Sequence, residues 1–231
     1  MSLTILAIGD DDAAPGFLGE RATQRGHELV CVSRYGSPDE LRLDGVDVVM
    51  PLGSVWSVTD RGSNAWIERE LDLLHEAITD EIPVLGVCFG GQELAAALGG
   101  AVERARRPEL GWVAIDSDDA GVPAGPWFSW HKDELFVPDG VDVVATNESG
   151  VQAFRSGPHL GVQFHPEVTL EIIEFWCKEG ASRLEELGIS RDTLVAESSA
   201  LVDGARARAY ELMDGFLESV ERVEGVESAG S

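Results

Sequence analysis

One cysteine stands among glycines where an apolar segment gives way to a helical one, in GVCFGG. Gly86 and Gly90 lie two residues before and after Cys88. This spacing predicts a nucleophile elbow, a tight strand-to-helix turn that exposes the nucleophile and leaves room only for small neighbours. At a helix N-terminus the thiolate, the reactive form, is favoured, and the Phe89 N–H can stabilise an oxyanion. A buried structural cysteine explains this motif alone equally well.

A base for the cysteine is predicted in GVQFHPEV. An apolar strand ends at His165, Pro166 stops the strand, and Glu167 lies two residues beyond the histidine. The carboxylate of Glu167 can accept a hydrogen bond from one imidazole nitrogen while the other faces the thiol. The three residues together predict nucleophilic catalysis by a Cys-His-Glu triad.

The other cysteines and histidines fit catalysis less well. Cys31 falls within a predicted strand and Cys177 within a predicted helix, without glycines around them, so we interpret both as structural. We interpret the remaining histidines outside the WHKD segment as solvated surface residues; these are His27, His75 and His159.

Alternating strand and helix patterns must position the cysteine. Strands are predicted at residues 3–9, 27–33, 46–53 and 82–87, with helices near 17–25, from Asn64 onward and at 89–98. This order favours an α/β fold with an open, twisted, mostly parallel sheet and helices on both faces. The short segments WVAID, ELFV, VDVVAT, QAFRS and LGVQF predict a small antiparallel section. We expect one domain over residues 1–180 and a helical extension packed on it over 181–231.

The charge of the chain bounds its partners and location. Its 231 residues include 42 acidic ones against 17 Lys and Arg, a net charge of −25. Such a surface repels nucleic acid and anionic lipid, so neither nucleic acid nor a membrane is an expected partner. No apolar run is long enough to span a membrane, the start lacks the features of a signal peptide, and three scattered cysteines favour a reducing cytoplasm.

Two motifs carry a resemblance to a known family. GVCFGGQELAAALGG together with GVQFHPE resembles the class I glutamine amidotransferases, and most of all chains similar to the glutaminase domain of GMP synthetase. The match extends from about residue 46 to about 175. The resemblance implies a flavodoxin-like amidotransferase fold and a triad that hydrolyses the side-chain amide of glutamine and releases ammonia. It implies no metal or organic cofactor.

The resemblance assigns roles residue by residue. Cys88 resembles the nucleophile, His165 the general base and acid, and Glu167 its orienter. Gln92 resembles the residue that contacts substrate glutamine. Gly53 and Ser54 resemble the loop that supplies the second oxyanion N–H beside that of Phe89, although the family pattern there is Gly-Gly-Pro. The segment WHKD resembles the one whose backbone holds the α-amino and α-carboxyl groups of glutamine, and it consists of Trp130, His131, Lys132 and Asp133. ELGW, residues 109–112, also resembles a recurring family segment but has no assigned role.

Three functions remain open. The first is a glutaminase that supplies ammonia to a separate acceptor enzyme, a synthetase subunit. Its isolated activity is expected to be low, because Ser54 is less free than glycine to turn its peptide into the donor position. The second is a self-sufficient hydrolase of γ-glutamyl conjugates, favoured by the unusual WHKD and PLGS segments. The third is a non-catalytic subunit that senses a ligand.

Overall fold

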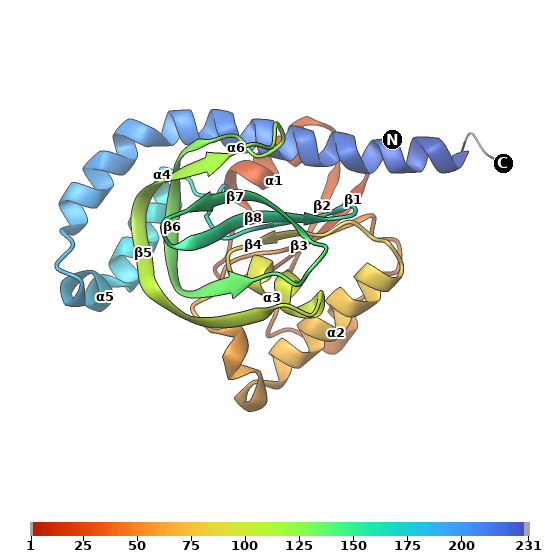
Figure 1. Cartoon of the computed structure of the whole chain (residues 1–231), viewed down its shortest axis with the longest axis horizontal. Helices are drawn as coiled ribbons and strands as arrows, with labels where there is room; N and C mark the ends of the chain where they lie inside the picture. Colours follow the sequence, from red (N-terminus) through yellow and green to blue (C-terminus); the bar gives the residue numbers. More distant parts are fainter. Residues whose placement is uncertain (1, 229–231) are drawn as a thin grey trace.

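The computed structural model describes residues 2–228 of the chain (Figure 1). The strands are β1 (Thr4–Gly9), β2 (Glu28–Ser33), β3 (Val48–Pro51), β4 (Leu85–Val87), β5 (Ala101–Ser117), β6 (Gly125–Phe136), β7 (Asp142–Asn147), β8 (Gly150–Ser156) and β9 (His159–Val162). The α-helices are α1 (Gly16–Gln24), α2 (Ala65–Thr79), α3 (Phe89–Ala97), α4 (Leu170–Glu179), α5 (Ala181–Glu186) and α6 (Arg191–Ser228), and two short 3₁₀ helices are η1 (Pro38–Glu40) and η2 (Val58–Ser63).

The strands form a mixed sheet. Three strands lie in the order β2-β1-β3 and six in the order β4-β9-β8-β7-β5-β6. A parallel bridge between Val49 and Val84 connects the two groups. The pairs β1–β2, β1–β3 and β4–β9 are parallel, and the remaining pairs are antiparallel. The predicted α/β fold with a parallel sheet and an antiparallel section is therefore confirmed.

Helices cover both faces of the parallel strands. Along β1, Ile5 and Ala7 belong to an apolar cluster with residues of α1 and α6, whereas Leu6 and Ile8 belong to another with residues of α2 and α3. Successive side chains of a strand point to opposite faces, so a nearly continuous apolar run is what a sheet buried on both sides requires.

The antiparallel section is more extensive than the sequence suggested. β5 is a single strand of 17 residues that curls across the sheet together with β6 (Figure 1). Only WVAID within it has the expected apolar pattern, because charged residues fill its first half. The register of β5 and β6 shifts between Arg104 and Glu109, and beyond this irregularity Glu109 lies opposite His131.

The carboxyl ends of three adjacent parallel strands meet at one edge of the sheet. The loop with Gly53 follows β3, Cys88 follows β4, and His165 lies shortly after β9. In open α/β sheets this edge is where ligands bind. The topology thus brings together residues that are far apart in the sequence.

The long helix α6 packs against α1 and against the apolar core. Its Asp214 pairs with Arg21 and Arg25, at 2.6 and 3.0 Å, beside α1. Ala209, Leu212 and Phe216 contribute to the apolar core. The division of the chain at residue 180 into a domain and an extension stays a prediction, and residues 229–231 of that extension lie outside the described part. None of the described helices combines the length and apolarity needed to cross a membrane.

Candidate active site

Cys88 occupies a strained turn at the start of α3. Its backbone has φ 52° and ψ −104°, and within residues 2–228 only Glu81 shares a positive φ among non-glycine residues. A side chain on Gly90 would bring its Cβ within 2.1 Å of the Pro51 carbonyl oxygen, so this position must be glycine. The turn holds the thiol where the unpaired N–H groups of the first turn of α3 favour an anion. Such strain is characteristic of functional positions.

His165 and Glu167 form a buried pair beside the cysteine. The distance from His165 Nδ1 to Glu167 Oε1 is 2.7 Å, and both side chains are almost fully buried. Burial alone would lower the pKa of His165, but the charges of Glu167 and Cys88 and their hydrogen bonds raise that pKa well above its ordinary value. The imidazolium form is therefore stabilised next to the thiol, as an ion pair with a thiolate requires.

The loop after β3 lies against both Cys88 and His165. A Cβ added to Gly53 would come within 2.7 Å of His165 Cε1 and 3.7 Å of Cys88 Cβ. The neighbouring Ser54 donates from its hydroxyl to the carboxylate of Asp10, at 3.1 Å from each oxygen. No acceptor among residues 2–228 pairs with the N–H groups of Gly53 and Ser54. These N–H groups remain available to an oxyanion.

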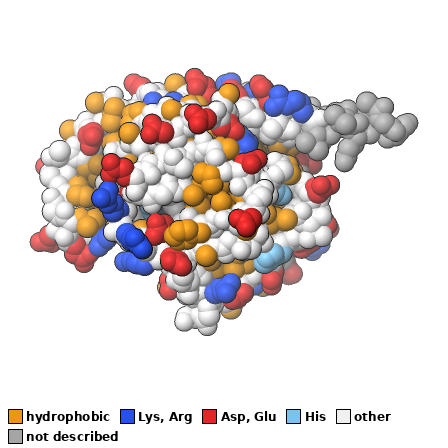
Figure 2. Space-filling model, in the orientation of Figure 1, with side chains coloured by type: hydrophobic (Ala, Val, Ile, Leu, Met, Phe, Trp, Pro, Cys, Tyr) orange, Lys and Arg blue, Asp and Glu red, His pale blue; other side chains and the backbone are white. Residues whose placement is uncertain are grey.

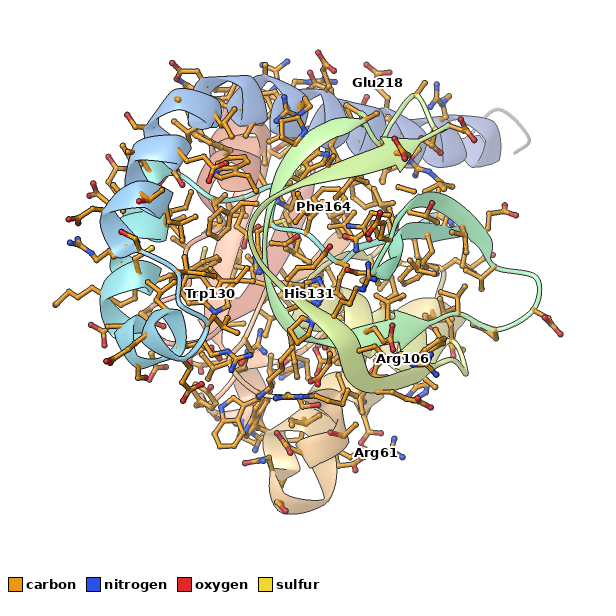
Figure 3. All side chains as sticks on the ribbon, turned by 60° about the vertical axis from the view of Figure 1, so that its left-hand side comes forward. Arg61, Arg106, Trp130, His131, Phe164 and Glu218 are labelled. Carbon is orange, nitrogen blue, oxygen red and sulfur yellow. The ribbon has the colours of Figure 1, made fainter. Side chains whose placement is uncertain are left out.

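The WHKD segment on β6 faces the same region. In Figure 3, Trp130 lies on the side of α4 and α5, whereas His131 lies nearer the centre of the view. The Trp130 ring meets that of Trp176 edge-on, with centroids 6.3 Å apart. The Lys132 ammonium donates to the Val55 carbonyl oxygen at 3.0 Å and so connects β6 to the loop after β3. The Asp133 carboxylate lies 3.4 Å from Arg104.

A single cavity of about 530 Å³ contains all of these positions. It is lined by every residue that the sequence placed in the site: Cys88, His165, Glu167, Phe89, Gly53, Ser54, Gln92, Trp130, His131, Lys132 and Asp133. Two aromatic residues of α4, Phe175 and Trp176, are also among the residues that line the cavity. Among the described residues, no group of three or more His, Cys, Asp or Glu is arranged to hold a metal ion.

Acidic side chains are scattered over the face of the molecule shown in Figure 2, with a smaller group of basic ones toward its left. This distribution agrees with the net charge of −25. The cavity itself is lined by residues of both charges: Lys132 and Arg183 are basic, and Asp10 and Glu109 are acidic. A zwitterionic amino acid would meet groups of either charge there.

Comparison with known proteins decides the family. The model of the family described as glutamine amidotransferase class-I matches residues 21–173. The chain belongs to this family. Its matched segment contains the elbow, the His165–Glu167 pair and the WHKD strand, so the resemblance seen in the two sequence motifs is confirmed.

Individual relatives of this amidotransferase agree with the family assignment. One subunit of a glutamine-hydrolyzing GMP synthase from Methanocaldococcus jannaschii is 37% identical over 128 residues, which are 48% of this chain and 68% of the relative. A GMP synthase from Rhizobium johnstonii is 33% identical over 129 residues, 50% of this chain but only 24% of the relative. A crystal structure of a glutamine amidotransferase from Thermotoga maritima matches 94% of this chain and 99% of its own with a TM-score of 0.85 at 24% identity, which supports the fold.

A buried charged cluster beneath the elbow of this amidotransferase has no counterpart among the sequence predictions. Arg34 is fully buried, lies 4.9 Å over the ring of Phe89, and donates to the Leu52 carbonyl oxygen at 2.9 Å. It lies 3.3 Å from Asp10, the residue that holds Ser54. Arg34 thus contacts both segments that carry the proposed oxyanion donors. Scattered charged residues give no sequence signal of such a cluster.

Two carboxyl groups complete this cluster. Glu70 on α2 and Glu93 on α3 are fully buried, and Glu70 lies 3.8 Å from Arg34. Burial raises the pKa of both; that of Glu93 rises well above its ordinary value, with the charge of Glu70 adding to the effect. We assign the neutral form to Glu93 and the ion pair with Arg34 to Glu70.

Two histidines contradict their sequence interpretation. His27 and His159 are 6% and 4% exposed, not solvated. His27 Nδ1 accepts a hydrogen bond from the Leu3 N–H at 3.1 Å. His159 begins β9 in the interior of the sheet, and burial lowers its pKa to about 4. The Gly-Pro pair before His159 indicated a surface loop, but β9 begins directly after this turn.

Proposed function

We propose that this amidotransferase hydrolyses the side-chain amide of glutamine by covalent catalysis. The observation that carries the proposal is the strained elbow of Cys88 beside the buried His165–Glu167 pair. The thiolate of Cys88 attacks the γ-carboxamide carbon, and the N–H of Phe89 and one from the loop at Gly53 and Ser54 stabilise the oxyanion. His165 protonates the departing ammonia.

The second half of the reaction regenerates the enzyme. His165 takes a proton from water, which attacks the γ-glutamyl thioester, and glutamate leaves. Glu167 keeps the imidazole oriented and stabilises its cationic form without exchanging protons with substrate. Gln92 and the WHKD segment are proposed to bind the substrate.

We further propose that the ammonia passes to a separate acceptor enzyme. The support is the similarity to the Methanocaldococcus relative, whose name describes it as one subunit of a GMP synthase. The matched region makes up only 24% of the Rhizobium GMP synthase.

A second candidate is hydrolysis of γ-glutamyl conjugates in which the departing group is larger than ammonia. The cavity of about 530 Å³ favours it, because pockets of roughly 300–1,000 Å³ hold drug-sized ligands and glutamine is much smaller. A ligand-sensing protein without catalysis is the weakest candidate, since it has no need of a strained nucleophile with a paired base.

Selective labelling tests the proposed nucleophile. A γ-glutamyl-directed alkylating analogue should label Cys88 and spare Cys31 and Cys177, as read by peptide mass spectrometry. Cys88→Ala should abolish turnover while the protein stays folded. Preferential labelling of either other cysteine would remove Cys88 from the mechanism. Cys31 is the more stringent control because it is exposed and open to the reagent, whereas Cys177 is buried.

A further inference from the structure

The buried Gln163 contacts the sulfur of the proposed nucleophile. Its side-chain Nε2 lies 3.7 Å from Cys88 Sγ, within the range of an N–H···S hydrogen bond. We propose that Gln163 is a further catalytic residue whose amide N–H stabilises the Cys88 thiolate. This inference rests on the proposed function for the role of that thiolate, but it can be tested without glutamine turnover.

The direction of the Gln163 amide follows from a neighbouring backbone carbonyl. The Asp133 carbonyl oxygen can only accept a hydrogen bond, and Gln92 Nε2 donates to it at 3.4 Å. The same Gln92 nitrogen donates to Gln163 Oε1 at 3.1 Å. With its oxygen taken by Gln92, Gln163 presents its NH₂ group to Cys88. These hydrogen bonds, from Asp133 through Gln92 to Gln163, exclude the flipped orientation of the Gln163 amide. The flipped amide would place an oxygen lone pair against the sulfur of Cys88.

A buried contact between His131 and Glu109 anchors the other end of this chain of hydrogen bonds. His131 Nδ1 lies 2.8 Å from the Asp133 carbonyl oxygen, and its Nε2 lies 2.9 Å from the Glu109 carboxylate. Both partners are acceptors, so both hydrogen bonds form only when both ring nitrogens carry protons. Glu109 stays anionic: burial opposes ionisation, but the hydrogen bond and charge of His131 outweigh it and lower the pKa of Glu109.

Further amides fix the carboxylate of Glu109 in place. Asn147 Nδ2 donates to it at 2.7 Å and Gln152 Nε2 at 3.2 Å. The ELGW and WHKD segments therefore have a shared role in positioning. Glu109, His131 and Gln92 are positioning residues that act on Cys88 through Gln163.

Burial makes this chain of hydrogen bonds effective. Gln163 and Gln92 are 1% and 3% exposed. A hydrogen bond to an anion is stronger where water does not compete for it. The bond matters at two moments, in the resting thiolate and when thioester hydrolysis breaks the C–S bond and the electron pair returns to sulfur.

The test measures the reactivity of Cys88 toward iodoacetamide, a small neutral alkylating agent that needs no glutamine site. Gln163→Met removes the donor but keeps the length of the side chain. Alkylation of the Cys88 peptide at pH 7, followed by mass spectrometry, should slow by about tenfold, the scale of one hydrogen bond to a charged group. Ser198→Ala removes a buried hydrogen bond to Trp112 outside the cavity and should leave alkylation unchanged.

A second variant separates orientation from substrate binding. Gln92→Leu keeps Gln163 but frees its amide to flip, so alkylation by iodoacetamide should slow here too, by a smaller factor. A residue that only contacts glutamine would change KM and leave alkylation unaffected. If folded Gln163→Met and Gln92→Leu both react at the wild-type rate, the inference is wrong. Should wild-type protein fail to hydrolyse glutamine while these variants still alkylate slowly, the proposed function fails and the role of Gln163 stands.

Discussion

Nδ1 of His165 lies 2.7 Å from Oε1 of Glu167, and the ring of Trp176 packs edge-on against the imidazole, 4.7 Å away between centroids. The histidine therefore has one orientation, with its remaining nitrogen directed to the cavity that Cys88 lines. Glu167 both orients the imidazole of His165 and stabilises its positive charge, so replacing Glu167 tests both effects.

Replacing Glu167 by Gln should lower kcat for glutamine by about 10²- to 10⁴-fold with little change in KM, as for orienting carboxylates in other triads. The raised pKa of His165 means that its imidazolium is fully stabilised below pH 6.5 and loses this stabilisation as pH rises through the raised value. Without the carboxylate that pKa falls, so the alkaline limb of the pH–rate profile should move to lower pH. Equal activity of variant and wild type would exclude Glu167 from catalysis.

Replacing Ser54 by Gly should raise the glutaminase activity of the isolated chain. The Ser54 hydroxyl ties the loop to Asp10, and this tether restrains the peptide that would supply the second oxyanion donor. One such donor is worth about 10²–10³ in rate, so an increase in kcat of about tenfold or more is expected. The control is Ser57→Ala, which removes the cap of η2 in the same loop and should alter stability without altering kcat. A fall in kcat for Ser54→Gly would mean that the tether holds a productive loop.

Replacing Glu93 by Gln should stabilise the protein increasingly as pH rises. The folded-state pKa of Glu93 is well above its ordinary 4.5, so the wild type loses stability as pH increases from about 4.5 toward that raised value. Each unit of difference is worth about 1.4 kcal/mol in the free energy of unfolding. Urea unfolding at pH 5 and pH 8 should show a larger gain at pH 8. Glu68→Gln on the exposed face of α2 should change stability equally at both pH values, and a pH-independent gain for Glu93→Gln would contradict a buried neutral carboxyl.

The elbow and the histidine pair could be predicted because their demands are local. Cys88 needs small residues two positions away, and Glu167 lies two residues from the histidine it contacts, so short motifs record both. The fold class followed from apolar runs that alternate with helical patterns. These features need no knowledge of distant contacts.

The contacts that support the site could not be predicted because the residues that make them are distant in the sequence. Gln163 and Gln92 are 71 residues apart, and their meeting depends on how α3 and β9 pack. Arg34 in the turn after β2, Glu70 on α2 and Glu93 on α3 converge from three separate segments in the same way. The length of β5 was hidden because arginines and glutamates occupy the strand's first half, where an apolar alternation would otherwise mark it.

Steady-state release of ammonia by the purified wild-type chain, with glutamine and then with γ-glutamyl amines, tests the central claim most directly. We predict slow release from glutamine that is lost in Cys88→Ala, and no faster turnover of the γ-glutamyl amines. Turnover of a γ-glutamyl amine at ordinary enzyme rates with glutamine inert would contradict the glutaminase and establish the conjugate hydrolase in its place.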